Sequence, residues 1–338
     1  MGSQKKIPVV DEYGFYEIRF DSIGGLGAHL AGQLLGEAAA IKMGMNALHF
    51  SSYGSEKKGS PIKSFMRFAE ADREIRSCSP VERPHMVAVF HDALLKTPGM
   101  LAGLRSGGTL IINTRKSYDE IKAVLPTNCR IYLIDALTIS LQEKSRVNTA
   151  MMGAVAQLSG FLDPEAVLST LADAFQKKYP AAVEGNKKTF LRGMKEAKLV
   201  FEPKGANGTK DEKPPRPKPK FGYLNAPIGG AILEAGNTAL KDMSSSRQGY
   251  LPVWHEDKCV HCGLCDLVCP DHCFVWAMEK AAEAGKPDRT RLKGIDYSYC
   301  KGCLRCVDSC PSGALTKELE TEGYAKEHSV PLFPEVRK

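Results

Sequence analysis

The sequence predicts an α/β protein in which a larger domain is followed by a small cysteine-rich α+β domain. Over residues 1–201, short apolar runs alternate with segments of helical spacing. This alternation is typical of a mostly parallel sheet with helices on both faces. A stretch rich in proline and lysine, residues 202–222, then interrupts the pattern. Beyond it, eight of the eleven cysteines gather in two short runs.

The larger domain opens with a strand, a glycine-rich turn and a helix. Residues 15–21 alternate as a strand does, and residues 28–42 have helical spacing. The turn Gly24-Gly25-Leu26-Gly27 leads into a helix N-terminus, which can accept an anion. However, Leu30 stands where the dinucleotide-binding pattern requires glycine, and the next strand ends in serines rather than an acidic residue. NAD binding is therefore not predicted.

Further elements follow in the order expected of an α/β domain. Strands are predicted from the apolar runs at 47–50, 62–69, 86–90, 109–113 and 130–134. The polar loop at 51–61 is either a solvated connection or a binding loop. From residue 148 the pattern becomes helical, with helices predicted at 149–161, 165–175 and 186–201.

Composition divides the rest of the chain into four segments. They are a linker (202–222), a connecting segment (223–250), the cysteine-rich domain (251–320) and a C-terminal arm (321–338). We expect the connecting segment to lie over a partner or over the first domain, and the arm to extend over another subunit. Two strands within the cysteine-rich domain, at 274–278 and 291–297, predict a hairpin insert between the runs.

The two cysteine runs have identical spacing, and each ends in a proline. They are Cys259, Cys262, Cys265 and Cys269 with Pro270, and Cys300, Cys303, Cys306 and Cys310 with Pro311. The C-x2-C-x2-C-x3-C-P pattern is that of bacterial two-cluster ferredoxins. Three thiolates at these intervals can bind one face of an iron–sulfur cube, while the fourth cysteine of each run binds the other cluster.

Two [4Fe–4S] clusters in a ferredoxin-like domain are therefore predicted. One would be held by Cys259, Cys262, Cys265 and Cys310, and the other by Cys300, Cys303, Cys306 and Cys269. Structural zinc usually takes cysteine pairs from separated loops, and a disulfide framework suits a short secreted chain, so neither explains the pattern. Cys273, four residues after a predicted ligand, is interpreted as a buried residue that lines a cluster.

Charge and hydropathy exclude several classes of protein. The net charge is +7 at pH 7, but part of the excess lies in the linker and no basic helix with interleaved aromatic residues occurs, so nucleic-acid binding is not predicted. No apolar run approaches eighteen residues, which excludes a transmembrane helix. Many reduced cysteines without an N-terminal hydrophobic segment indicate the cytoplasm. The sequence contains no recognisable catalytic triad, P-loop or thiamine-binding motif, so no catalytic residue is predicted.

Several short motifs accompany the cysteine runs. In the larger domain they are Gly24-Gly25-Leu26-Gly27, Tyr53-Gly54-Ser55-Glu56 with Gly59 and Pro61, Ile134-Asp135-Ala136, Asn148-Thr149-Ala150, and Asn186 with Phe190 and Gly193. The second cysteine run contains Tyr299-Cys300-Lys301-Gly302-Cys303. With these motifs the chain resembles the 2-oxoacid:ferredoxin oxidoreductases, as though their γ and δ subunits were fused. The resemblance covers about residues 1–201 and 223–320.

The resemblance implies an electron-transfer subunit of a thiamine-diphosphate-dependent complex. Partner chains, α-like and β-like, would bind thiamine diphosphate, Mg²⁺ and a further [4Fe–4S] cluster, and would cleave the 2-oxoacid. The two clusters on this chain would pass electrons to an external ferredoxin.

Two departures from the family pattern bear on the substrate. Family members usually carry Gln where Leu26 stands and an Arg near Lys57-Lys58, and in acyl-CoA-forming members the γ domain helps to bind coenzyme A. Pyruvate and oxalate both stay open, since oxalate oxidoreductase within the family needs no coenzyme A. The alternatives are a subunit of an indolepyruvate-type oxidoreductase, or a dedicated iron–sulfur electron carrier without a fixed catalytic partner.

Overall fold

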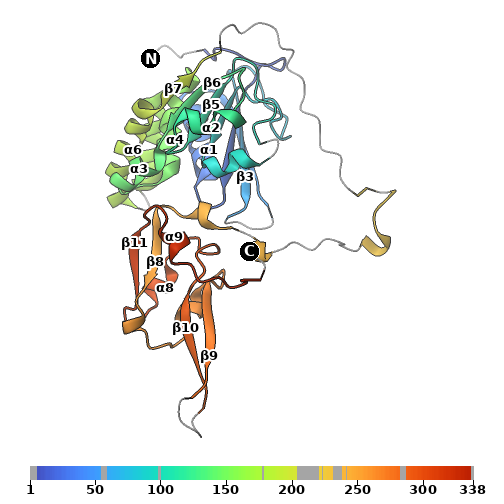
Figure 1. The fold of residues 1–338 in the computed structure, drawn as a ribbon. Coiled ribbons are helices and arrows are strands. Elements are labelled where there is room, and N and C mark those ends of the chain that lie inside the picture. The colour runs from blue at the N-terminus through green and yellow to red at the C-terminus, as the bar shows by residue number, and fades with distance from the viewer. Residues whose placement is uncertain are drawn as a thin grey trace. The chain divides into compact units, whose positions relative to one another are not determined.

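The chain divides into two compact units, Met1–Pro214 and Pro215–Lys338, each described by itself (Figure 1). The computed structural model describes residues 6–54, 59–97, 100–176, 179–203, 221–222, 224–230, 238–240, 242–281 and 287–335. Most of the predicted linker therefore lies outside the described residues, as do residues 55–58 of the predicted loop.

A mixed sheet of seven strands forms the centre of the described part of the first unit, in the order β2-β3-β1-β4-β5-β6-β7. Its middle strands are mutually parallel: β1 (Tyr16–Ile23), β4 (Met86–Val89), β5 (Thr109–Asn113) and β6 (Arg130–Ile134). The edges are antiparallel, with β2 (Asn46–Ser52) and β3 (Pro61–Ala69) on one side and β7 (Lys198–Phe201) on the other. The predicted α/β class is confirmed.

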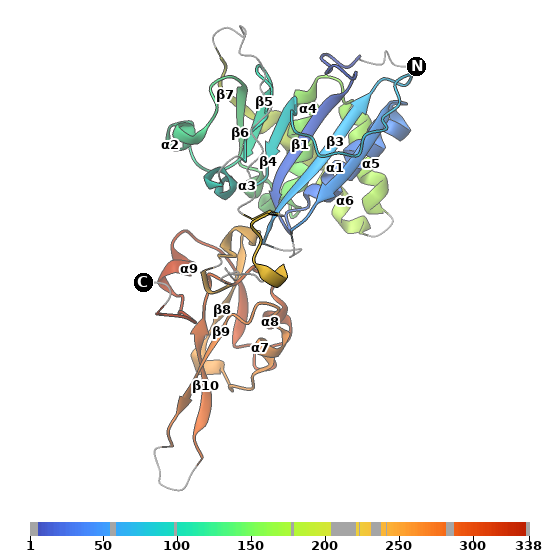
Figure 2. The ribbon, with the colours of Figure 1, turned by 90° about the vertical axis from the view of Figure 1, so that its right-hand side faces the viewer.

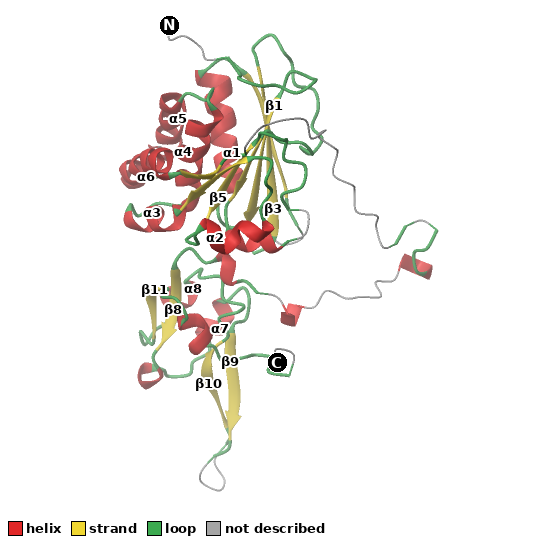
Figure 3. Ribbon diagram, turned by 45° about the horizontal axis from the view of Figure 1, so that its top comes forward, coloured by secondary structure: helices red, strands yellow, loops and turns green. Residues whose placement is uncertain are grey.

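The long helices cover one side of this sheet, and loops with short helical segments lie on the other (Figure 3). The longest are α1 (Ala28–Glu37), α4 (Val147–Ser159), α5 (Pro164–Gln176) and α6 (Val183–Glu196). α1 continues into a π-helical turn at Ala38–Lys42, and the shorter helices are α2 (Tyr118–Ile121) and α3 (Ala136–Gln142). The predicted helix at 186–201 ends at Glu196, because the last residues pair with β6 as β7.

Strand β1 is buried along its whole length, although its residues alternate between apolar and charged. Ile18 and Phe20 belong to the apolar core. On the other face, Arg19 lies 3.0 Å from the Asp21 carboxylate, and Arg67 of β3 lies 2.8 Å from the Glu17 carboxylate. Both guanidinium groups also donate to loop carbonyls, so each buried charge is paired and hydrogen-bonded.

Helices α4 and α6 approach so closely that side chains are excluded between them. A Cβ atom added at Gly153 would lie 2.1 Å from the Phe190 carbonyl oxygen. One added at Gly193 would lie 2.1 Å from the Ala150 carbonyl oxygen. Glycine is therefore required on both helices, which explains why Gly193 belongs to the motif.

The second unit is built from two small antiparallel sheets and short helices (Figure 2). β8 (Tyr250–Trp254) pairs with β11 (Leu315–Leu319), and β9 (Phe274–Glu279) pairs with β10 (Arg289–Ile295). The second pair is the predicted hairpin insert. The helices α7 (Leu264–Val268) and α8 (Arg305–Asp308) each begin within a cysteine run.

The end of the connecting segment packs within the second unit, and its expected contact with a partner or with the first domain stays a prediction. Arg247 is buried there and lies 2.7 Å from the Glu320 carboxylate. Its guanidinium also donates to the carbonyl oxygens of Tyr297 and Cys300, at 2.8 and 2.9 Å. A buried charge needs such partners, and this arginine thereby holds the second cysteine loop in place.

The C-terminal arm also packs on its own unit rather than extending freely. After α9 (Tyr324–Glu327), the backbone N–H of Val330 donates to the Ile295 carbonyl at 3.0 Å. The buried Asp296 carboxylate accepts from the Leu332 N–H at 2.9 Å. The expectation that the arm also lies over another subunit stays a prediction. Among the described helices, none is long and apolar enough to cross a membrane.

Candidate metal centres

The two cysteine runs share one backbone shape. The second and fourth residues after the first cysteine have positive φ in both: 53° at His261 and 81° at Gly263, then 65° at Gly302 and 61° at Leu304. Such values are uncommon for residues other than glycine. Residues of positive φ within a turn can direct successive N–H groups toward one side, where they bind an anion. Each run therefore folds as a loop suited to a negatively charged group.

Four of the predicted ligands line one cavity of the second unit, here called the first cavity. They are Cys259, Cys262 and Cys265 of the first run and Cys310 of the second. Trp254, Trp276, Leu292 and Leu315 supply much of the remaining wall. Cys265 is buried, whereas Cys262 is exposed.

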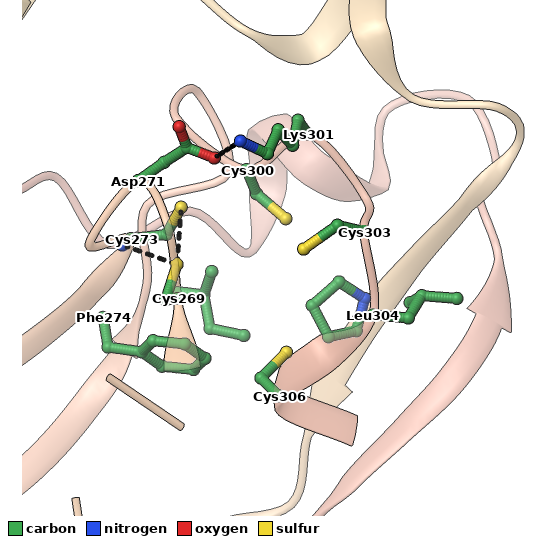
Figure 4. A pocket seen from close by; sticks show the side chains of 11 residues that line it. Cys269, Asp271, Cys273, Phe274, Cys300, Lys301, Cys303, Leu304 and Cys306 are labelled. Atoms are coloured by element: carbon green, nitrogen blue, oxygen red, sulfur yellow. Dashed lines mark hydrogen bonds and ion pairs between the residues drawn. The ribbon is translucent and has the colours of Figure 1, made fainter. Parts of the chain in front are cut away.

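The other four predicted ligands line a separate, second cavity (Figure 4). They are Cys300, Cys303 and Cys306 of the second run and Cys269 of the first. Figure 4 shows their sulfur atoms around a common space, with Phe274 and Leu304 beside them. The structure thus groups the eight cysteines in the two sets that the spacing predicts, each with one member from the other run.

Cys273 is a fifth cysteine at the second cavity, as the sequence led us to expect. It is 2% exposed, and its Sγ lies 3.6 Å from Sγ of Cys269. Its backbone N–H also donates to that sulfur at 3.5 Å. The hydrogen bond from the Cys273 thiol is the main cause that lowers the pKa of Cys269 to about 6. Cys269 is therefore ready to bind iron as a thiolate.

Burial acts in the opposite direction on Cys265 and Cys306. It raises the pKa of Cys265 to about 12, and it raises the pKa of Cys306 as well. Thiols in such surroundings become thiolates when a metal replaces the proton. Asp271, which also lines the second cavity, is already paired with Lys301 at 2.7 Å and leaves the thiols as the free donors.

The donor sets fit iron–sulfur clusters better than single ions. Within the described ranges, no three histidine, cysteine or acidic side chains are arranged to hold one metal ion. The indole nitrogens of Trp254 and Trp276, both at the first cavity, are buried without a hydrogen-bond partner in the described part of the chain. Sulfur atoms of a cluster would satisfy such donors.

An α/β unit joined to a unit with two cysteine-lined cavities defines an iron–sulfur oxidoreductase chain. Residues 17–196 match the family model "Pyruvate ferredoxin/flavodoxin oxidoreductase", and residues 256–314 match the model "4Fe-4S dicluster domain". The chain belongs to the pyruvate ferredoxin/flavodoxin oxidoreductase family.

Two relatives found by sequence agree with this assignment, and one solved structure is similar to the chain. "Pyruvate synthase subunit PorC" of Thermotoga maritima is 36% identical over 195 residues, 57% of this chain and 98% of the relative. "Pyruvate-flavodoxin oxidoreductase" of Klebsiella pneumoniae is 26% identical over 317 residues, 80% of this chain and 27% of the relative. The crystal structure of pyruvate oxidoreductase subunit PORC from Thermotoga maritima covers 55% of this chain and 98% of its own, at 32% identity and a TM-score of 0.49. The chain thus combines the γ-subunit domain of a 2-oxoacid:ferredoxin oxidoreductase with a 4Fe–4S dicluster domain.

The motif residues of the first unit connect its elements. The Asn148 amide of α4 donates to the Gly27 carbonyl at 3.3 Å, across the turn before α1. The Thr149 hydroxyl donates to the Asn186 side chain of α6 at 2.8 Å. Leu26 is buried in the core and presents no polar atom to a ligand, whereas Lys57 and Lys58 lie outside the described residues.

Sequence reasoning missed several features of the site, among them Trp254, Trp276, Arg247 and the Lys301–Asp271 pair. Alternation within a strand could have placed the tryptophans on the inner face, because residues two apart share a face. Nothing local in the sequence shows which cavity that face meets.

Proposed function

We propose that this chain is the fused γ–δ electron-transfer subunit of a thiamine-diphosphate-dependent 2-oxoacid:ferredoxin oxidoreductase. The observation that carries the proposal is the division of eight cysteines between two cavities in a member of this family. Chains of α-like and β-like type would bind thiamine diphosphate, Mg²⁺ and a further [4Fe–4S] cluster, and would carry out the oxidation. An external ferredoxin would accept the electrons.

Each cavity would hold one cluster through four thiolates. Cys259, Cys262, Cys265 and Cys310 are the ligands in the first cavity, and Cys269, Cys300, Cys303 and Cys306 those in the second. This ligation is crossed, since each run gives its last cysteine to the other cluster. Because of this crossed ligation, each cluster would link the two cysteine runs covalently and so stabilise the fold of this unit.

The chain's own residues serve electron transfer by holding the ligands still. Clusters of this type supply one-electron transfer at low potential when bound. Arg247 fixes the carbonyl of Cys300, and the Cys273 N–H fixes Cys269. Apolar walls limit water around the sulfurs, and hydrogen bonds and exposure together set the potential. These residues would form and break no bond of the substrate, so the partner chains would carry out the oxidation of the 2-oxoacid.

The substrate is a 2-oxoacid, with pyruvate and oxalate as the candidates. Relatives named pyruvate synthase subunit favour pyruvate. The apolar, buried Leu26 is consistent with a γ domain that does not bind coenzyme A, which would favour oxalate.

Iron counts in paired variants test the crossed ligation. Anaerobically purified full-length chain should contain about eight iron and eight sulfide, and Cys310→Ser should retain about four iron. Adding Cys262→Ser to Cys310→Ser should cost no further iron, because both thiols serve the same cluster. Adding Cys303→Ser should remove nearly all of it.

The mirror pair, Cys269→Ser with Cys303→Ser or with Cys262→Ser, is the matched control and should give the reverse pattern. If Cys310→Ser with Cys303→Ser retained four iron, each run would hold its own cluster and the crossed assignment would be wrong. Wild-type chain with about four iron would sink the assignment of two clusters.

A further inference from the structure

Both tryptophans of the chain lie at the first cavity. The sequence contains two, Trp254 at the end of β8 and Trp276 in β9, and each lines the cavity that Cys259, Cys262, Cys265 and Cys310 also line. The rings are half-buried, but both Nε1 atoms are fully buried. In the described part of the chain, neither indole N–H has a hydrogen-bond acceptor, and no cysteine sulfur serves as one.

An unpaired donor in a buried position is costly. Leaving one without a partner costs about 1–3 kcal/mol, and a buried indole N–H usually finds an acceptor. Two such donors at one cavity are therefore informative. The cavity that both residues line is the one whose four thiols fit a [4Fe–4S] cluster, so sulfur atoms of that cluster are candidate acceptors for these two donors.

The second cavity differs although the same two strands line it. Two residues before the tryptophans, Pro252 of β8 and Phe274 of β9 line the second cavity. Residues two apart on a strand share a face, so each strand spans both cavities. Proline and phenylalanine side chains carry no hydrogen-bond donor. The strands thus present two N–H donors to one cluster and only carbon to the other.

We propose that Trp254 and Trp276 are positioning residues that donate N–H···S hydrogen bonds to the cluster in the first cavity and raise its reduction potential. This inference rests on the proposed function, since it requires that the cavity hold a cluster. Reduction adds a negative charge, which a hydrogen-bond donor stabilises more than it stabilises the oxidised cluster. Loss of a donor therefore makes the cluster harder to reduce.

The first test needs no substitution. Full-length chain is produced with ¹⁵N in the indole ring of tryptophan, which labels these two side chains alone. After anaerobic reduction, pulsed EPR should detect ¹⁵N hyperfine coupling to the cluster whose signal disappears in Cys262→Ser. The cluster whose signal disappears in Cys303→Ser should show none.

The second test measures potentials by anaerobic redox titration of the full chain. Trp254→Phe and Trp276→Phe keep an aromatic ring but remove the N–H. For each, the reduced-to-oxidised ratio of the first cluster at a given potential should fall on the order of tenfold, which for one electron is a shift of about 59 mV to more negative potential. The second cluster should keep its potential. Phe274→Leu, at the second cavity, is the control and should not change the first cluster.

The outcomes separate the two proposals. Chain that binds no iron after anaerobic reconstitution contradicts the proposed function itself. Chain with both clusters but without ¹⁵N coupling, and with unchanged potentials in both tryptophan variants, overturns this inference alone. If a tryptophan variant loses its cluster, the ¹⁵N measurement on the unsubstituted chain still shows whether the indole N–H groups contact the cluster.

Discussion

At the residue scale, His49 is a half-buried base on β2, at the edge of the first unit's sheet. Its Nε2 lies 2.8 Å from the Ser64 hydroxyl, and its ring packs so tightly on α1 that a Cβ at Gly32 would lie 2.7 Å from it. Burial, and secondarily the neighbouring His29, lowers the pKa of His49 to about 4. The folded protein therefore keeps this imidazole neutral at pH values where an unfolded chain would protonate it.

The sign of the resulting pH dependence follows from proton uptake. Between about pH 6.5, the ordinary pKa of histidine, and about 4, the unfolded state binds more protons at His49 than the folded state. The local stability of β2 and β3 should thus be complete above pH 6.5 and decrease as the pH falls to about 4. Hydrogen exchange of the β2 and β3 amides should show this decrease in wild type. His49→Gln, which keeps a hydrogen-bonding group for Ser64, should flatten it.

His328→Gln is the matched control, because that residue lies in the second unit. It should leave the exchange of β2 and β3 unchanged at every pH. An equal pH dependence in wild type and His49→Gln would show that another group is responsible.

Single residues differ in how far the sequence identifies them. The eight cysteines could be identified because the spacing of the ligands is visible in the sequence. The structure places them at two cavities in the expected sets. Trp254, Arg247 and Asp296 could not be identified, since their roles depend on contacts between segments more than thirty residues apart or on a cavity wall. Burial of a polar group at a site is a property of the folded chain and leaves no local pattern.

At the element scale, the contact between α4 and α6 depends on glycine. Gly193→Ala would place a methyl group against the Ala150 carbonyl, where neither backbone can yield without moving its helix. We expect a loss of about 1–3 kcal/mol in the free energy of unfolding of the first unit, or more if the helices cannot separate. Chemical denaturation followed by hydrogen exchange in α4 and α6 measures it.

Gly36→Ala provides the control within a helix of the same unit. A Cβ there meets only ordinary van der Waals contact, 3.6 Å from His49 Cβ. That substitution should be neutral or stabilising by about 0.4–1 kcal/mol, because alanine reduces the freedom of the unfolded chain. Equal effects of the two substitutions would mean that helix propensity, not close approach, explains the glycines.

Elements with a strong local pattern were predictable, and elements made by distant pairing were not. The strands β1 to β6, the helices α1, α4 and α5, and the β9–β10 hairpin follow the periodicity of their own residues. The sequence of β7 predicts a helix, but these residues form a strand because they pair with the free edge of β6. β8 and β11 are separated by some sixty residues and pair through the cluster domain's fold. The arm packs on β10 for the same reason.

At the scale of the whole molecule, the two units divide one task. The first unit contains tightly packed helices and paired buried charges, whereas nine of the eleven cysteines belong to the second unit. Under the proposed function, this chain carries electrons and other chains carry out the oxidation, so activity should depend on those chains.

Purification through this chain tests that dependence. A tagged chain isolated anaerobically should bring thiamine-binding chains with it. The complex should reduce ferredoxin when given pyruvate with coenzyme A, or when given oxalate without it, and 2-oxoglutarate should serve as the third substrate compared.

Cys303→Ser should retain the partner chains but lose ferredoxin reduction, because one cluster of the relay is missing. Cys78→Ser, an exposed cysteine outside both runs, should behave as wild type. A chain that purifies without thiamine-binding partners, or a Cys303→Ser complex that reduces ferredoxin at the wild-type rate, would contradict the assigned role.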